Sequence, residues 1–305
     1  MGTVEKEVKE IFVNLLKNDH IGLNDNFFEQ GGNSISYLQL ISNIYKIFNV
    51  EIPAIYSLNN TNINKLSRYI LLNQNLNSSK KSYNLLNNSS ERKLFCFPPI
   101  QGFGLLYNKL AKHFDDLAFY SFDFIEDENR IRQYAEDIIE IKPQDSYVLF
   151  GFSAGANLAF ETAKELEAKG KTVSHIIIWD SYQKMQKLEL TDSITTKHKK
   201  DVEQFLNEND MNFATRKVLD KSISYINYYY GMVNNGTVNA TIYNFIAENS
   251  KKRIDLDVNE TYEDWTNSSK TYREIKAFGE HDTMLDDENI DKNLKSLRQV
   301  MDNIF

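Results

Sequence analysis

Hydrophobic residues recur at helical spacing through the first quarter of the chain. Three such series occupy residues 4–16, 35–48 and 63–71. Residues three or four positions apart share one face of a helix, so each series predicts an amphipathic helix. We therefore expect residues 1–75 to form a small all-α bundle of three or four helices.

Beyond residue 92 the pattern changes to short apolar runs that alternate with helical stretches. The runs predict strands at 93–97, 118–122, 147–150, 173–179, 237–246 and 272–278, and the helical patterns cover 104–114, 131–141, 154–168 and 288–305. Such alternation predicts a mostly parallel sheet with helices on both faces. Residues 182–235 break the rhythm, because they are long and helix-like, and we interpret them as an insertion between two strands.

A polar stretch separates the two patterns. Asparagine and serine supply 11 of the 18 residues from Asn73 to Ser90. These side chains bury little surface and compete for backbone hydrogen bonds, which favours a linker. We predict a helical domain over 1–75, a linker over 76–91 and an α/β domain over 92–305. The chain begins within a helical pattern, so we expect it to be a segment of a longer protein.

Composition and charge exclude several classes of protein. The net charge is −8 and no basic patch stands out, which argues against nucleic-acid binding. No apolar run reaches the length of about 18 residues that a membrane span needs. The charged N-terminus is unlike a signal peptide. Cys96 is the only cysteine, so a disulfide within the chain is impossible, and we expect a cytoplasmic protein with this thiol buried.

Ser153 lies in the sequence Gly151-Phe152-Ser153-Ala154-Gly155, between a predicted strand and a predicted helix. The two glycines permit the sharp turn and close backbone approach that a nucleophile elbow requires. A serine held there projects its hydroxyl above the sheet, beside a helix N-terminus that favours developing negative charge. The alternative is an ordinary turn serine.

A nucleophilic serine needs a histidine as base. His20 lies in the helical domain, His113 in a predicted helix and His175 at the start of a strand. His198 lies among lysines in the insertion, and we expect it to be solvated. His281 follows the last predicted strand, and loops after parallel strands gather at the edge where Ser153 lies. We predict that His281 is the base.

The base needs an orienting acid, and three places compete for this role. Asp180 directly follows the strand predicted at 173–179, so its direction is set by the strand end. Asp255 and Asp257 follow the next strand in a looser, charged stretch, and Asp123 follows the second strand but precedes the nucleophile. We rank Asp180 first.

An oxyanion hole needs two backbone N–H donors, and Ala154, the residue after the nucleophile, supplies one. The second should come from the loop after the first strand of the sheet. Pro98 and Pro99 have no N–H, so Ile100 is the first available donor and Gln101 is the alternative.

Ser34 lies in Gly31-Gly32-Asn33-Ser34, at the start of a predicted helix. The N–H groups and dipole of a helix N-terminus would stabilise a phosphodiester on this serine. Serine is also a favoured helix N-cap, which is the alternative interpretation.

The surrounding residues carry a resemblance to a known family. Asn26-Phe27-Phe28-Glu29-Gln30-Gly31-Gly32-Asn33-Ser34 resembles the phosphopantetheine attachment motif of peptidyl carrier domains in non-ribosomal peptide synthetases. The resemblance implies that Ser34 carries covalent 4′-phosphopantetheine, added by a separate phosphopantetheinyl transferase.

The second part of the chain carries another resemblance. The segments 97–104, 151–155, 180–182 and 279–281 together resemble the type I thioesterase domains that end such synthetases, especially the surfactin-type cyclising ones. The resemblance implies an α/β-hydrolase fold with a helical lid over 182–235 and a serine thioesterase with the triad Ser153, Asp180 and His281. It places no metal in the site. The sequence of the insertion matches that of the family least well, and by the resemblance this is the segment that would set substrate preference.

Together these features predict release of a peptidyl thioester, delivered by upstream condensation and adenylation domains, through an ester on Ser153. Attack by a group of the peptide would give a ring, towards which we lean, and water would give a linear acid. Aromatic residues of the insertion could form a lid wall that excludes water or simply pack on the core. Two alternatives are a carrier or docking module with an inactive hydrolase domain, and a free esterase with a helical appendage.

Overall fold

The computed structural model describes residues 3–52, 61–74, 82–87, 90–111, 113–143, 146–208, 215–248, 250 and 262–305. They fall into two compact units, which we call the helical unit (Met1–Lys80) and the α/β unit (Lys81–Phe305). Each unit is described by itself.

The helical unit contains three described helices, α1 (Thr3–Leu16), α2 (Ser34–Phe48) and α4 (Ile63–Gln74). Their apolar faces meet around Phe27, which is fully buried and packs edge-on against Phe12 at a centroid distance of 5.0 Å. A Cβ atom at Gly32 would lie 2.3 Å from the Phe27 ring, so only glycine fits there. Two residues of the motif around Ser34 therefore serve to hold its loop in place. Phe27 anchors the loop in the core, and Gly32 lets the loop pass over the Phe27 ring.

The α/β unit is built on a seven-stranded sheet with the strand order β1-β3-β2-β4-β5-β7-β9. All neighbours in this sheet run parallel except β1, which pairs antiparallel with β3 at one edge. The strands are β1 (Tyr83–Leu85), β2 (Lys93–Phe97), β3 (Ala118–Phe122), β4 (Tyr147–Phe152), β5 (Val173–Trp179), β7 (Val238–Ile246) and β9 (Ser269–Lys276). Parallel strands bring their carboxyl ends to one edge, which positions the site described below.

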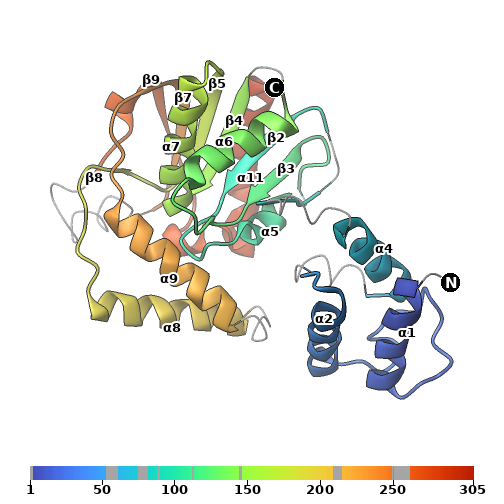
Figure 1. Cartoon of the computed structure of the whole chain (residues 1–305). Helices are drawn as coiled ribbons and strands as arrows, with labels where there is room; N and C mark the ends of the chain where they lie inside the picture. The colour runs from blue at the N-terminus through green and yellow to red at the C-terminus, as the bar shows by residue number, and fades with distance from the viewer. Residues whose placement is uncertain are drawn as a thin grey trace. The chain divides into compact units, whose positions relative to one another are not determined.

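Helices cover both faces of this sheet (Figure 1). On one face, α6 (Arg130–Ile141) and α7 (Ala154–Ala168) bury an aromatic core around Phe97, Tyr134 and Phe160. On the other face, η1 (Gly104–Tyr107), α5 (Asn108–Ala111) and α11 (Asp287–Ile304) cover a second core that includes Trp179. Cys96 belongs to this second core, and burial raises the pKa of its thiol well above the ordinary value, as expected for a buried small apolar residue.

The segment between β5 and β7 contains β6 (Gln183–Lys184) and two long helices, α8 (Asp192–Glu208) and α9 (Thr215–Gly231). The helices lie side by side below the sheet in Figure 1. Tyr225 of α9 is fully buried and stacks on Phe124 at a centroid distance of 4.2 Å. At this point the aromatic stripe of the insertion packs on the core. Met211 and Phe213, two other apolar residues of the insertion, lie outside the described residues. The remaining elements are β8 (Tyr262–Glu263), which pairs with β6, then η3 (Thr266–Ser268) and η4 (His281–Thr283).

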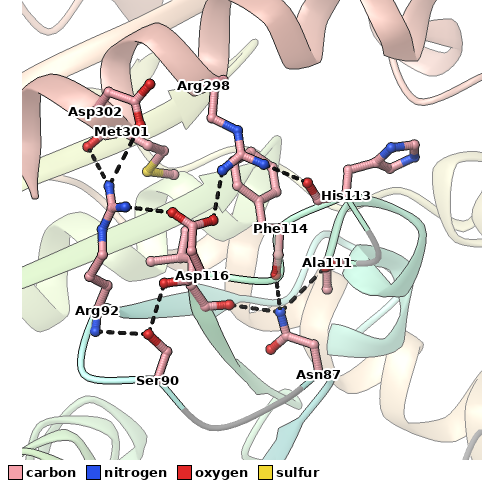
Figure 2. A network of polar contacts seen from close by, with 11 residues as sticks. Asn87, Ser90, Arg92, Ala111, His113, Phe114, Asp116, Arg298, Met301 and Asp302 are labelled. Atoms are coloured by element: carbon pink, nitrogen blue, oxygen red, sulfur yellow. Dashed lines mark hydrogen bonds and ion pairs between the residues drawn. The ribbon is translucent and has the colours of Figure 1, made fainter.

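The stretch predicted as a linker over 76–91 contains structured residues. Tyr83–Leu85 form β1, and the Asn87 side chain donates to the carbonyls of Ala111, Phe114 and Leu117 while its oxygen accepts the Phe119 N–H. Figure 2 shows how this contact adjoins a second one, in which Asp116 accepts from Arg92 and Arg298. Residues 83–87, which were predicted to belong to the linker, are therefore fastened to the sheet and belong to the α/β unit.

Other predicted elements agree with the structure except at their ends. The helix expected over 104–114 is a short 3₁₀ turn followed by one turn of α-helix, η1 and α5, and the last strand begins at Ser269 rather than at residue 272. Within the described parts of the chain, no helix combines the length and apolar character that a bilayer crossing requires.

Candidate active site

Ser153 stands between β4 and α7 in a backbone conformation that side chains rarely adopt, with φ 53° and ψ −128°. A strained serine of this kind persists only when its surroundings hold it in place. Here the Ser153 N–H donates to the carbonyl of Trp179, the last residue of β5, over 3.0 Å. The predicted strand-to-helix elbow is therefore present.

The two glycines of the motif are explained by close backbone approach. A Cβ atom at Gly151 would lie 2.4 Å from the Ala156 nitrogen, and one at Gly155 would lie 2.4 Å from the carbonyl oxygen of Phe97 and 2.9 Å from that of Pro98. Larger residues would push the start of α7 away from β2 and β4. The same contacts bring the loop after β2 beside the first turn of α7.

His281 begins η4, two residues after the left-handed Gly279 (φ 85°), in the loop that follows β9. Its Nε2 atom lies 3.0 Å from Ser153 Oγ, and its ring faces that of Phe152 at a centroid distance of 4.9 Å. The side chain is 11% exposed. An imidazole in this position can accept the hydroxyl proton of Ser153.

Asp180 follows β5 and is completely buried. Its Oδ2 atom lies 2.6 Å from His281 Nδ1, and its Oδ1 atom accepts the Ala247 N–H over 3.0 Å. Burial alone would raise the pKa of this carboxyl, but the hydrogen bonds from His281 and Ala247 and the attraction of a protonated imidazole outweigh it and hold the pKa below its ordinary value. The carboxylate is therefore charged at neutral pH and can stabilise an imidazolium.

The structure brings Ser153, His281 and Asp180 together, whereas the competing Asp123 has other partners. Asp123 Oδ1 accepts the Gly104 N–H, and its Oδ2 lies 3.9 Å from Lys221 Nζ. Asp255 and Asp257 lie outside the described residues.

Of the other histidines, His20 and His113 are exposed, and His175 lies in the N-terminal half of β5. The expectation that His198 is solvated is wrong. It is 8% exposed, and its Nε2 atom lies 2.6 Å from Ser222 Oγ of the neighbouring helix α9. A signal for this burial exists in the sequence, since Ile194 and Val202 lie four residues on either side and mark an apolar helix face.

The loop after β2 forms a turn in which the Gly102 N–H donates to the Pro99 carbonyl over 2.8 Å. Ile100 and Gln101 are the central residues of this turn, which lies beside the start of α7. The Ser153 N–H is already used by Trp179, so Ala154 is the first N–H of α7 that faces no acceptor within its own helix. Ala154 directly follows Ser153, and the loop after β2 approaches the first turn of α7 at Gly155.

Two residues that support the site were missed by sequence reasoning. The hydroxyl of Tyr107, a fully buried residue, donates to the Phe97 carbonyl over 2.6 Å and accepts the Phe152 N–H over 3.0 Å, so it ties the ends of β2 and β4 together. Ala247 orients Asp180 through its backbone. Neither belongs to a motif, and a tyrosine or alanine in an apolar stretch gives no sign of such a contact.

The loop before α2 resolves the two interpretations of Ser34. Asn33 is the N-cap, because its side chain accepts the Ser36 N–H over 2.9 Å, and Ser36 Oγ accepts the Asn33 N–H in return. Ser34 is the first residue of the helix and is exposed. The capping role therefore belongs to Asn33, and the Ser34 hydroxyl is placed where a phosphodiester would meet the N-terminus of a helix of 15 residues.

A parallel sheet with a serine elbow after one strand, a buried acid after the next and a histidine after the last is the architecture of the α/β-hydrolases. Comparison with known families narrows this class. A thioesterase-domain model matches residues 92–303, and a phosphopantetheine attachment-site model matches residues 6–70. The chain belongs to the thioesterase-domain family, preceded here by a carrier domain of the kind that bears covalent 4′-phosphopantetheine.

Similar proteins combine the same two domains within much longer chains. A mycosubtilin synthase protein of Bacillus subtilis is 32% identical over 98% of this chain, and surfactin synthase subunit 3 of Bacillus subtilis (strain 168) is 31% identical over 98% of it. This chain spans 11% and 23% of their respective lengths. The chain is also similar to a solved structure of SrfTE, the thioesterase domain described as cyclising the lipopeptide antibiotic surfactin. The sequence identity is 32% and the TM-score is 0.64. The match covers 72% of this chain and 96% of the SrfTE chain.

Proposed function

We propose that this chain releases an acyl chain, held as a thioester on its carrier domain, by transferring it to Ser153 and then to a second nucleophile. The observation that carries the proposal is the continuous contact from Ser153 Oγ through His281 to the buried carboxylate of Asp180, at 3.0 and 2.6 Å. The family membership supplies the substrate class, since a thioester is what a thioesterase domain acts on.

In the first half of the reaction, His281 Nε2 takes the proton of Ser153 as Oγ attacks the thioester carbonyl. The N–H groups of Ala154 and Ile100 stabilise the oxyanion that forms, with Gln101 as the alternative to Ile100. His281 then returns the proton to the departing sulfur, and the acyl group remains as an ester on Ser153. Asp180 keeps Nδ1–H of the ring directed towards itself, so that Nε2 faces the reacting atoms.

In the second half, His281 accepts a proton from the incoming nucleophile and gives it to Ser153 Oγ as the ester bond breaks, which restores the serine hydroxyl and the neutral imidazole. Water as nucleophile gives a linear acid, and a hydroxyl or amine of the acyl chain gives a ring. We favour ring formation because the α/β unit is 32% identical to a thioesterase domain described as cyclising a lipopeptide. The insertion with α8 and α9 is the candidate lid that would restrict water.

Ser34 is the residue that would hold the 4′-phosphopantetheine. Its place at the first position of α2 fits the group, because the adjacent N–H groups and the helix dipole favour the phosphodiester. When bound, the cofactor supplies the thiol on which the acyl chain is carried. The proposed partners are a phosphopantetheinyl transferase, which attaches the cofactor, and upstream synthetase modules with condensation and adenylation domains, which build the peptide.

The attachment is tested by coexpressing the chain with such a transferase and measuring the intact mass. Wild-type protein should gain the mass of one phosphopantetheine, and Ser34→Ala should not. Ser36→Ala is the matched control, because it removes the neighbouring capping hydroxyl and should still be modified. An unchanged wild-type mass, or equal modification of Ser34→Ala, would contradict the assignment.

The release reaction is tested with a peptidyl thioester and product analysis by mass spectrometry. Wild-type protein should consume the thioester and react with an active-site phosphonate, whereas Ser153→Ala should do neither. A cyclic product supports the preferred outcome, and a linear acid alone would assign the chain to hydrolytic release. A wild-type protein that leaves both reagents untouched would identify an inactive hydrolase domain.

A further inference from the structure

The turn that follows β2 is held largely from outside itself. Within the turn, Gly102 N–H donates to the Pro99 carbonyl, and the Gly102 carbonyl accepts the Phe124 N–H over 2.9 Å. Among the described residues, two further contacts come from α9. Tyr225 donates its buried hydroxyl to the Pro98 carbonyl over 3.1 Å, and Ser222 donates its hydroxyl to the Ile100 carbonyl over 3.4 Å.

The Ser222 contact acts on the most mobile part of such a turn. The central peptide joins the Ile100 carbonyl to the Gln101 N–H, and type I and type II turns differ by roughly half a rotation of this peptide. Gln101 has no positive φ, which excludes the type II form here. A hydrogen bond that holds the Ile100 carbonyl therefore opposes the rotation that would redirect the Gln101 N–H, the alternative oxyanion donor of the turn.

His198 completes this contact from α8. Ser222 has one hydroxyl hydrogen; when this hydrogen is directed at the Ile100 carbonyl, the Ser222 oxygen accepts a hydrogen from His198 Nε2, 2.6 Å away. Burial lowers the pKa of His198, against the opposing effects of its contact with Ser222 and the charge of Asp201. The ring is then neutral at neutral pH, with its single hydrogen on Nε2.

The pair is unsuited to a catalytic role of its own. Ser222 is completely buried and His198 is 8% exposed, so an acyl chain cannot reach this hydroxyl as it can that of Ser153. The hydroxyl is also directed at a backbone carbonyl rather than at open space. The chain of hydrogen bonds runs from a side chain on α8, through one on α9, to the loop beside the nucleophile.

We infer that His198 and Ser222 are positioning residues, which hold the oxyanion-binding turn in its productive orientation from within the inserted helices. This inference rests on the proposed function, in which the turn supplies an oxyanion donor. The insertion would then contribute to rate as well as to substrate selection. Loss of either side chain should weaken stabilisation of the oxyanion and leave the binding of the acyl chain unchanged.

The experiment measures kcat and KM for a small acyl thioester with the full chain. The variants are Ser222→Ala, His198→Ala, the double variant and His198→Gln, whose side-chain amide can replace the donor Nε2–H. Exposed Lys199→Ala, next to His198 on α8, is the matched control. Titration with an active-site phosphonate gives the fraction of competent protein, so that kcat is expressed per active site and poor folding is separated from slow chemistry.

Ser222→Ala and His198→Ala should each lower kcat by on the order of 10- to 100-fold with KM nearly unchanged, as expected for a small displacement of a catalytic group. The double variant should be no slower than the slower single variant, because both residues act through one chain of contacts. His198→Gln should recover most of the rate.

Three results would overturn the inference: single variants that keep the wild-type kcat, a His198→Gln variant as slow as His198→Ala, or a loss confined to KM or to the active fraction. If His198→Ala fails to fold, Ser222→Ala alone carries the test, since it removes a single oxygen. Failure of the proposed function gives a different result, because wild-type protein would then turn over no thioester.

Discussion

Replacement of Asp180 by asparagine separates the orienting role of the carboxylate from its volume. The side chain has two distinct contacts, since Oδ1 accepts the Ala247 N–H and Oδ2 faces His281 Nδ1. Ala247 can only donate, so in the Asp180→Asn variant the amide oxygen has to take the Oδ1 position. The NH₂ group of the new side chain then faces His281.

The consequence falls on the imidazole. An NH₂ group can only donate, so His281 Nδ1 must accept, and the hydrogen of the neutral ring moves to Nε2. That atom lies 3.0 Å from Ser153 Oγ and can no longer remove the serine proton. A change of tautomer of this kind costs about 10⁴-fold in kcat in serine proteases with the same arrangement, equivalent to about 5 kcal/mol of transition-state stabilisation.

The assay is turnover of an acyl thioester per phosphonate-reactive or folded molecule, with folding followed by circular dichroism. Asp123→Asn is the matched control, because Asp123 contacts Gly104 and Lys221 and should keep activity within severalfold of wild type. An Asp180→Asn variant within tenfold of wild type, or an Asp123→Asn variant slower than it, would refute the assignment of the acid.

Two further predictions concern stability. Gly155→Ala would place a Cβ atom 2.4 Å from the Phe97 carbonyl oxygen, so it should destabilise the fold by about 1–3 kcal/mol and slow turnover. Gly231→Ala is the control and should do neither, because there is open space around its Cβ position. Denaturant unfolding and kcat of both variants test this. The hydrogen bond from Arg298 lowers the pKa of Asp116 in the folded protein. This ion pair should therefore stabilise the fold at pH values above the ordinary pKa of an aspartate, by less than about 1 kcal/mol at this exposed site. The stabilisation should disappear as the pH falls through the lowered pKa of the folded state. Urea midpoints of wild type and Asp116→Asn should therefore differ at neutral pH and converge only as the pH falls below the lowered pKa of Asp116, and a difference that stays constant throughout an acid titration would contradict this cause.

The parts of the site that sequence reasoning could predict are those whose chemistry depends on position along a strand. Ser153 and Asp180 each directly follow an apolar strand and His281 lies in the loop after the last strand, and parallel strands bring such positions to one edge regardless of the loops between them. Helix α7 was predicted with its exact bounds, because the elbow defines its start and an uninterrupted amphipathic pattern defines its length.

The supporting contacts could not be predicted, because they depend on which elements pack together. The spacing of Ile194 and Val202 indicates that His198 is buried, but its contact with Ser222 depends on the packing of α8 on α9. Asn87 lies in a stretch whose composition indicates a linker, yet its amide donates to the carbonyls of Ala111, Phe114 and Leu117, which are distant from it in sequence. Amino-acid composition describes a segment as a whole, so it cannot predict the contacts that single side chains such as His198 and Asn87 make.

The two residues with the most strained backbone at the site are held by one device. Ser153 and Asp180 both have positive φ, 53° and 46°, a conformation that costs of order 1–3 kcal/mol for a residue with a side chain. Each follows the hydrogen-bonded end of a strand, and each donates its N–H to the last carbonyls of the neighbouring strand, Ser153 to Trp179 of β5 and Asp180 to Phe245 of β7. Because Trp179 directly precedes Asp180, the strand that anchors the nucleophile also carries the acid. The backbone hydrogen bonds between the parallel strands thus oppose the strain at both residues and fix the distance between them. For this reason Ser153 and Asp180, which are distant from His281 in sequence, can both lie within hydrogen-bonding distance of its ring.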